Sequence, residues 1–207
     1  MTPATHEPGH NPFATRYVRP GAVQYLFPSD CNAERLVERL RVNGWWGQIV
    51  GAHGSGKSSL LAALSPALNA ERCVISLTLH DGERRLDSGW RHRKPLDAHS
   101  LVVVDGYEQL SRWNKFRLKW ICRRRSAGLL VTAHANVGLP TLFETATDVP
   151  TAQRIVTGLL MPGDQTIGLG DIAQAWKARA GNLREALFDL YDLYEQRRGT
   201  GSNDSTS

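Results

Sequence analysis

One glycine-rich segment constrains the fold of this chain more than any other feature. Residues 51–58 read GAHGSGKS and satisfy the pattern G-x-x-x-x-G-K-[ST] of a phosphate-binding loop. Glycines let such a loop turn tightly and aim backbone N–H groups at phosphates, because no Cβ stands in the way. The lysine supplies a charge for the β- and γ-phosphates, and the serine supplies a hydroxyl for a metal ion. The segment therefore predicts a site for a nucleoside triphosphate and Mg²⁺.

The sequence on both sides of the loop has the context that such a site needs. Residues 47–50 form a short apolar run, and leucines at helical spacing follow over 59–68. A strand, the loop and a helix in that order would direct the helix N-terminus at the phosphates. Lys57 is a candidate catalytic residue, and Ser58 is a candidate metal ligand. The candidate nucleotide-binding residues are Gly51, Ala52, His53, Gly54, Ser55, Gly56, Lys57, Ser58 and Ser59.

A second motif for the same site comes later in the chain. Residues 101–104 are Leu-Val-Val-Val, and Asp105 follows them. A carboxylate at the C-terminal end of a buried strand is typical of a Walker B motif, in which it holds Mg²⁺ through water. Asp105 is therefore a candidate catalytic residue and metal ligand opposite Ser58. The alternative is an aspartate that caps a helix or a turn.

The base that would activate a water molecule is marked less clearly. Many ATPases with a phosphate-binding loop carry a glutamate directly after the Walker B aspartate, but this chain has Gly106 there. The next carboxylate, Glu108, is the candidate catalytic base. It either reaches the γ-phosphate, if Gly106 lets the chain curl, or sits in the first turn of a helix, where the dipole favours an acid. We therefore expect slow hydrolysis.

The nucleotide base is identified by elimination. Guanine is read by a motif N-K-x-D, and residues 114–117 read NKFR, with arginine in place of the aspartate. The expected cofactors are therefore ATP and Mg²⁺ rather than GTP and Mg²⁺.

Strand-type and helix-type segments alternate through the first 150 residues, which predicts an α/β fold: a three-layer core with a parallel sheet. After residue 150 only helical patterns follow, and they predict a small C-terminal helical lid. Runs of strand character lie at 47–50, 73–77, 101–104 and 129–132, with a weaker one near 142–149. The expected divisions are an extended lead-in over 1–28, the core over 29–150, the lid over 151–198 and a disordered tail over 199–207.

Composition sets broader limits. With 207 residues, 41% of them hydrophobic, the chain is large enough for one packed domain with a small appendage. Its three cysteines have no C-x-x-C spacing, which argues against a disulfide framework or a zinc site. No apolar run reaches the length of a membrane span, so we expect a soluble, cytoplasmic protein with no membrane partner.

Taken together, these motifs resemble the AAA+ ATPases and the related signalling NTPases over about residues 33–195. The most specific element is the helical segment 181–187, GNLREAL, which resembles the lid signature G-[DN]-x-R-x-A-L of clamp loaders and replication initiators. The resemblance implies that Arg184 senses the γ-phosphate from the lid. It also implies a polar first sensor at the end of the strand 129–132, which corresponds to Thr132 or His134.

The chain departs from this pattern in one further respect. Residues 126–153 contain no lysine or arginine, yet the arginine finger of the AAA+ class normally lies between the first sensor and the lid. Such a finger stabilises transition-state charge on a neighbouring subunit's nucleotide. Residues 123–125, three arginines just upstream, are possible substitutes, although basic residues are also common at a solvated helix C-terminus.

Positive charge and aromatic residues gather in segments 84–94 and 113–125. Such surfaces suit nucleic acid or an acidic protein partner, and they also occur as solvated faces whose tryptophans are in the core. The leading hypothesis is an AAA+-like slow ATPase or nucleotide switch that acts on a macromolecular partner. One alternative is a small-molecule or nucleotide kinase, with 84–94 as a lid and Asp81, Asp87 or Asp97 at the acceptor. The other is an ATP-regulated nucleic-acid-binding adaptor.

Overall fold

The computed structural model describes residues 10–19, 21–86, 89–90 and 96–201. Its described parts form two compact units. One, called here the sheet unit, comprises residues 27–52 and 60–145. The other, called the helical unit, comprises the described residues within 10–26, 53–59 and 146–201. Of the two basic segments, 113–125 is described in full and 84–94 only in part, because residues 87–88 and 91–95 lie outside the described residues.

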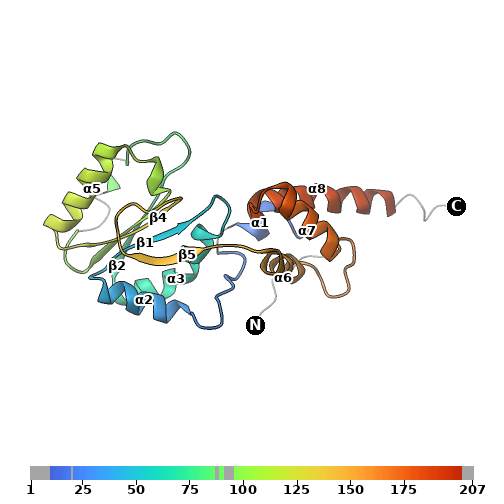
Figure 1. Cartoon of the computed structure of the whole chain (residues 1–207), viewed down its shortest axis with the longest axis horizontal. Helices are drawn as coiled ribbons and strands as arrows, with labels where there is room; N and C mark the ends of the chain where they lie inside the picture. The colour runs from blue at the N-terminus through green and yellow to red at the C-terminus, as the bar shows by residue number, and fades with distance from the viewer. Residues whose placement is uncertain (1–9, 20, 87–88, 91–95, 202–207) are drawn as a thin grey trace. The chain divides into compact units, whose positions relative to one another are not determined.

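The sheet unit is built on five parallel strands, in agreement with the predicted α/β fold (Figure 1). Their spatial order is β2-β3-β4-β1-β5, so that β4 lies between the two strands that carry the phosphate-site motifs, β1 and β3. All four neighbouring pairs are parallel. The strands are β1 (Trp46–Gly51), β2 (Cys73–Thr78), β3 (Ser100–Asp105), β4 (Gly128–Ala133) and β5 (Thr141–Thr145).

Alternate residues of the central strands pack against helix α5 (Arg112–Arg124). Val102 and Val104 of β3, with Leu129 and Val131 of β4, form one buried cluster with the inner side of that helix. Side chains of a strand alternate between faces, so these four residues share one side of the sheet. Trp90, from the mostly polar segment 80–100, is in the same cluster and only 4% exposed. Leu86 and Leu96 pack against the same cluster, but these apolar residues are too far apart in the segment to produce a periodic signal.

Two helices lie on the other side of the sheet, α2 (Ala33–Val42) and α3 (Lys57–Glu71), as Figure 1 shows. Helix α2 begins where Asn32 accepts a hydrogen bond from the N–H of Arg35, 2.8 Å away. Helix α3 continues through Pro66 and is longer than the predicted 59–68. The buried leucines of the two helices are Leu36, Leu40, Leu60, Leu64 and Leu68.

The helical unit has its own core. Its helices are α1 (Thr15–Val18), α6 (Val149–Leu159), α7 (Leu169–Ala178) and α8 (Leu183–Gly201), in the region where the sequence predicted a lid. Phe13, 1% exposed, packs edge-on against Tyr194 of α8 in this core. Asn11 donates hydrogen bonds to the carbonyl of Tyr191 and to the carboxylate of Glu195. The N-terminal segment was expected to be an extended lead-in, and these contacts instead make it part of the helical unit.

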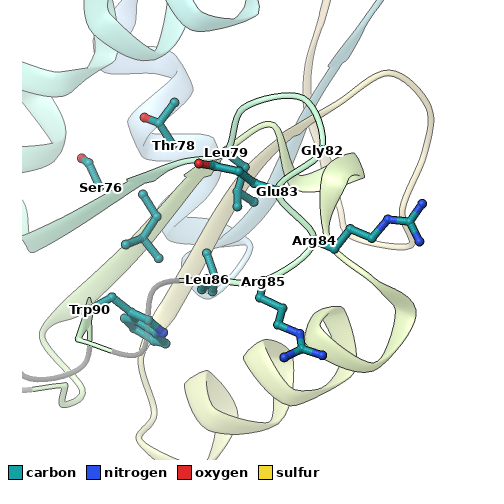
Figure 2. Close-up of a pocket in the computed structure, with 10 residues that line it drawn as sticks. Ser76, Thr78, Leu79, Gly82, Glu83, Arg84, Arg85, Leu86 and Trp90 are labelled. Carbon is teal, nitrogen blue, oxygen red and sulfur yellow. The ribbon is translucent and has the colours of Figure 1, made fainter.

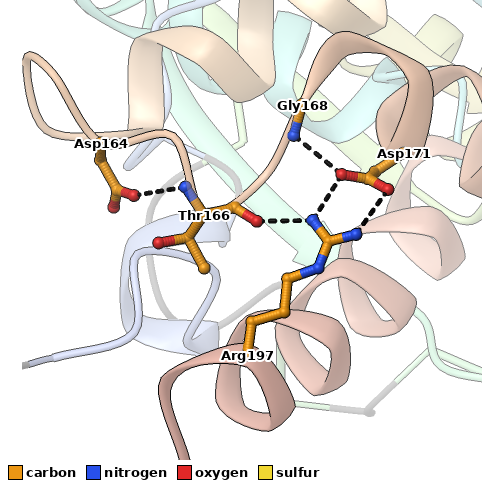
Figure 3. Close-up of polar contacts among 5 residues, drawn as sticks. All are labelled: Asp164, Thr166, Gly168, Asp171 and Arg197. Atoms are coloured by element: carbon orange, nitrogen blue, oxygen red, sulfur yellow. Dashed lines mark hydrogen bonds and ion pairs between the residues drawn. The ribbon is translucent and has the colours of Figure 1, made fainter. Parts of the chain in front are cut away.

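A charged cluster fastens the C-terminal helices to one another (Figure 3). The guanidinium of Arg197 on α8 donates to both carboxylate oxygens of Asp171 on α7, at 2.6 and 2.9 Å, and to the carbonyl of Thr166. Asp171 also accepts the backbone N–H of Gly168 at the start of α7. A bidentate arginine–carboxylate pair fixes orientation as well as distance. No helix among the described residues combines the length and apolar character needed to cross a membrane.

Candidate functional site

Three strand ends meet at one edge of the sheet. Val50 of β1 pairs with Ala133 of β4, and Val104 of β3 pairs with Val131 of the same strand. Because the strands are parallel, the C-terminal ends of β1, β4 and β3 lie side by side. Gly51, the first residue of the phosphate-binding loop, ends β1, and Asp105 ends β3. This edge is where open parallel sheets bind their ligands.

Thr132 on the middle strand holds the Walker B turn. Its hydroxyl donates to Oδ1 of Asp105 at 2.5 Å and accepts the backbone N–H of Gly106 at 2.9 Å. Thr132 is completely buried. By donating to the carboxylate and accepting the N–H of the next residue, this hydroxyl restricts the orientation of the carboxylate. Of the two predicted positions for the first sensor, Thr132 is therefore the one in contact with Asp105.

Gly106 has a structural reason to be glycine. Its φ is +80°, and a Cβ at this position would lie 2.6 Å from the backbone oxygen of Leu79. The chain is held at this separation because the N–H of Leu79 donates to the carbonyl of Asp105 at 2.9 Å. A glutamate at position 106 would therefore need a different backbone path. The close packing between the ends of β2 and β3 therefore accounts for the absence of a glutamate at position 106.

Glu108 lies in the short 3-10 helix η1 (Tyr107–Gln109) and faces the end of β4. Its Oε1 is 3.0 Å from Nε2 of His134, the residue after β4. Its Oε2 is buried and makes no hydrogen bond within the described part of the chain. The two polar residues at the end of β4 thus contact the two candidate acids: Thr132 contacts Asp105, and His134 contacts Glu108.

The turn that carries Glu108 is anchored in the core. Tyr107 is completely buried, and burial raises the pKa of its hydroxyl to about 12. The ammonium of Lys115 on α5 lies 5.4 Å from the centre of the Tyr107 ring and donates to the carbonyl of Glu108 at 3.1 Å. Cation–π and hydrogen-bond contacts together restrict η1 to one position.

The phosphate-binding loop has the predicted backbone. Gly54 and Gly56 adopt φ values of +72° and +92°, which residues with a Cβ rarely adopt. Ser55 and Lys57 are buried, at 7% and 8% exposure, and helix α3 begins at Lys57. Ser58, the candidate metal ligand, is in the first turn of that helix. The loop therefore presents a helix N-terminus after a glycine-containing turn, the arrangement that favours anions.

Within the helical unit, Asn182 lies directly against the loop. A Cβ on Gly54 would be 1.9 Å from Oδ1 of Asn182, which also accepts the N–H of Glu185 at the start of α8. The sequence identified this asparagine only as part of the lid signature, without a role. Arg184, the predicted γ-phosphate sensor, is exposed in the first turn of α8.

The remaining candidate residues differ in their surroundings. Asp97 accepts the hydroxyl of Ser100 and the N–H of His99, and these hydrogen bonds lower its pKa, as expected for a turn residue. Asp81 accepts the side-chain amide of Gln109. Asp87 lies outside the described residues. Among the three candidate acceptor acids of a kinase, the two that are described are therefore engaged in local contacts.

A pocket of about 590 Å³ opens beside the edge strand β2 (Figure 2). Ser76, Thr78 and Leu79 line it from the strand side, and Arg84 and Arg85 line it from the segment that follows. In Figure 2 the guanidinium groups of both arginines extend away from the strand. The pocket has a mixed polar and apolar lining, with Glu83, Arg84 and Arg85 as its charged residues.

The comparisons with known proteins concern the fold. No protein-family model matches the sequence, and a search of curated proteins gave no significant match. Among solved structures, the chain is similar to Cdc6p from Pyrobaculum aerophilum, with a TM-score of 0.62 and 13% identity over 90% of this chain. The fold is that of an AAA+-like P-loop NTPase. The expected resemblance is thereby confirmed at the level of the fold.

The chain spans 66% of the length of the Cdc6p chain that it matches. A Walker-type ATPase of Pyrococcus abyssi is a weaker match, with a TM-score of 0.47 and 12% identity over 82% of this chain and 75% of that chain. PCH-2 of C. elegans has a TM-score of 0.38 and 15% identity over 81% of this chain and 66% of that chain. At these identities, what the related structures bind does not transfer directly to this chain.

Proposed function

We propose that this chain binds ATP with Mg²⁺ and works as a slow ATPase or nucleotide switch for a macromolecular partner. The observation that carries the proposal is the position of Thr132, which joins Asp105 to the end of β4, next to the strand that leads into the phosphate-binding loop. A phosphate-binding loop that continues from the end of β1 and an oriented carboxylate at the end of β3 are the two parts that a nucleotide site requires.

The donor set fits Mg²⁺. Ser58 offers a hydroxyl and Asp105 a carboxylate, and Mg²⁺ prefers such hard oxygen ligands while keeping several of its waters. Thr132 donates to Oδ1 of Asp105, so the orientation of the carboxylate is restrained. The bound ion would neutralise charge on the phosphates, and Lys57 would add the positive charge of its ammonium at the β- and γ-phosphates.

Slow turnover is part of the proposal. Position 106 cannot carry a glutamate without moving the backbone, so Glu108 is the remaining candidate base. Glu108 contacts His134 through Oε1, and its Oε2 is buried, so this oxygen would have to become accessible before it takes a proton from an attacking water. The stretch 126–153 supplies no arginine finger. We therefore expect hydrolysis well below the ~1–100 s⁻¹ typical of kinases.

The helical unit supplies the proposed nucleotide response. Asn182 contacts Gly54 of the loop, and Arg184 is two residues further along the same segment. A γ-phosphate would give Arg184 a partner that ADP lacks. Only such a differential interaction shifts a conformational equilibrium, so Arg184 is the residue through which ATP and ADP would be distinguished.

Calorimetry with Mg-ATP tests the proposal. Wild-type protein is titrated beside Lys57→Ala and beside Lys177→Ala, which removes an exposed lysine of α7 as a matched control. We expect Lys57→Ala to lose measurable binding and Lys177→Ala to keep the wild-type affinity. A second titration with Mg-GTP tests the preference for adenine. Wild-type affinity in Lys57→Ala would remove the basis for a nucleotide site at this loop.

The pocket beside β2 favours a second candidate, phosphoryl transfer to a small anionic acceptor. Arg84 and Arg85 at its rim suit an anion, and Leu79 at its floor is hydrogen-bonded to the Walker B residue Asp105. Transfer and hydrolysis are separated by incubating the protein with γ-labelled ATP and a panel of nucleoside monophosphates and sugar acids. Label that appears in an acceptor indicates a kinase, and label that appears only as inorganic phosphate indicates an ATPase. Arg84→Ala would weaken transfer without changing hydrolysis.

A further inference from the structure

Helix α5 exposes its large aromatic residues. Trp113, Phe116 and Trp120 are 68%, 61% and 51% exposed, although tryptophans at helical spacing are more often found in a core. The helix is instead held to the sheet by Leu118 and Cys122, which are buried. Of the two alternatives that the sequence left open for this segment, the structure therefore excludes an amphipathic helix with its tryptophans in the core.

These rings are spaced along one side of the helix. Residues three and four apart are neighbours on a helix surface, so Trp113, Phe116 and Trp120 form a single stripe. With a rise of 1.5 Å per residue, the two tryptophans are separated by about 10 Å along the helix axis. Trp113 and Phe116 already stack on each other, with ring centres 5.8 Å apart and planes inclined by 30°.

The charge on the same helix has one sign. Residues 112–125 contain seven basic residues and no acidic residue. Two of the seven are lysines that point to the body of the protein: Lys115 donates to the carbonyl of Glu108, and Lys119 donates to the carbonyl of Val137. The exposed positive charge is therefore carried by arginines, which are Arg112, Arg117, Arg123, Arg124 and Arg125.

Arginines and aromatic rings alternate within the stripe. Arg117 follows Phe116, and the guanidinium of Arg124 lies over the ring of Trp120, 5.4 Å from its centre. We propose that this α5 surface, comprising the three aromatic residues and the five arginines, binds single-stranded nucleic acid. Bases would stack on the rings, and the arginines would contact the phosphates between them. Combined positive charge and exposed aromatic rings are the usual means of binding single strands without sequence preference.

Two physical arguments favour this occupant over others. Residues 112–125 carry seven basic and no acidic residues, so the surface fits a polyanion, although arginine and aromatic residues are also enriched in protein–protein interfaces. A duplex keeps its bases stacked inside, so it offers phosphates to the arginines but no free base faces to the rings. A single strand uses both kinds of side chain at once. Binding of a single strand at the α5 surface requires no ATP. This inference therefore goes beyond the proposed function and does not depend on it.

Fluorescence anisotropy with a labelled 20-nucleotide strand tests the inference, using the full chain without ATP. Oligo-dT, oligo-rU and a duplex of equal length are compared at two or more salt concentrations. We expect both single strands to bind more tightly than the duplex. The double variant Trp113→Ala/Trp120→Ala should weaken single-strand binding at least tenfold, because each lost base stack costs about 1–3 kcal/mol. Arg117→Ala/Arg124→Ala should reduce the salt slope by about 1.4, at ~0.7 per phosphate contact.

Matched variants distinguish binding at the α5 surface from nonspecific binding of nucleic acid elsewhere on the protein. Phe188→Ala removes a 42%-exposed aromatic of α8, and Arg154→Ala removes an exposed arginine of α6. Both should bind like wild type. Equal affinity for duplex and single strand, or wild-type affinity in the tryptophan double variant, would overturn the proposal. The proposal would also be overturned if polyglutamate of the same charge displaced the labelled strand as readily as oligo-dT does. That result would indicate an acidic protein partner. Lys57→Ala should retain binding, which separates this result from any failure of the nucleotide site.

Discussion

The backbone oxygen of Leu79 lies 2.6 Å from the position that a Cβ would take on Gly106. This contact joins the end of β2 to the turn after Asp105, and it leaves room only for glycine. The residue that distinguishes this chain from many ATPases of similar motif is thus determined by packing between neighbouring strand ends. The same turn directs Glu108 to His134.

The first prediction concerns this contact. Gly106→Ala should lower the free energy of unfolding by more than Gly82→Ala does, measured by urea denaturation. Both glycines have a positive φ, at +80° and +87°, but a Cβ on Gly82 would meet nothing within 4 Å. Gly82→Ala therefore pays only the left-handed backbone cost of about 1–2 kcal/mol. If both changes lowered the free energy of unfolding equally, the backbone would be able to move away from Leu79 at no cost in stability.

The second prediction concerns Thr132. Thr132→Val keeps the shape but removes the hydroxyl that donates to Asp105 and accepts from Gly106. An unpaired buried polar group costs about 1–3 kcal/mol, so we expect a loss of stability of that order, together with weaker Mg-ATP hydrolysis. Thr132→Ser retains the hydroxyl and is the control. If the valine variant were as stable and active as the serine variant, the hydrogen bonds of Thr132 would not matter.

The third prediction concerns the coupling of nucleotide state to the helical unit. Arg184→Ala should reduce the ratio of ATP to ADP affinity at least about fivefold, the lower end of usual coupling strengths. Trp176 in α7 provides a fluorescence signal, which should respond less to ATP in the variant. Because Arg184 is exposed, its removal should leave the melting temperature nearly unchanged. Arg154→Ala is the matched control, and unchanged discrimination in folded Arg184→Ala would reduce this residue to a surface arginine.

The fourth prediction is a pH dependence in the helical unit. Hydrogen bonds from Arg197 hold the pKa of Asp171 below its usual value, against the opposing effect of burial. A carboxyl group with a lowered pKa stabilises the folded state above its unfolded pKa of about 3.9, and this contribution disappears as the pH falls through the folded pKa. Asp171→Asn should therefore lower the melting temperature at pH 7. The difference in melting temperature from the wild type should become smaller as the pH falls below about 4.

Asp192→Asn, an exposed change on α8, is the control for that experiment. It should shift the melting temperature little at either pH. A deficit of Asp171→Asn that is as large at pH 3 as at pH 7 would show that the amide disturbs packing rather than removing an ion pair with Arg197.

The sequence alone determined the elements whose signal is local. The loop 51–58, the apolar strand before Asp105 and the leucine spacing of α3 each depend on residues close in the chain, and the parallel α/β fold follows from their alternation. These patterns work because glycine conformations and strand and helix periods are properties of short segments. The roles assigned to the loop residues, Asp105 and Arg184 remain predictions for the experiments above.

Only the tertiary structure decided which residues meet. The pairing of Thr132 with Asp105 and of His134 with Glu108 depends on β4 lying beside β3, which is a contact between segments about 27 residues apart. Likewise, the spacing of Trp113, Phe116 and Trp120 fits a buried or an exposed stripe equally well. Their exposure follows from Leu118 and Cys122 turning the opposite face of α5 to the sheet. Periodicity defines a helix face, but the partner that the face packs against is chosen by the whole fold.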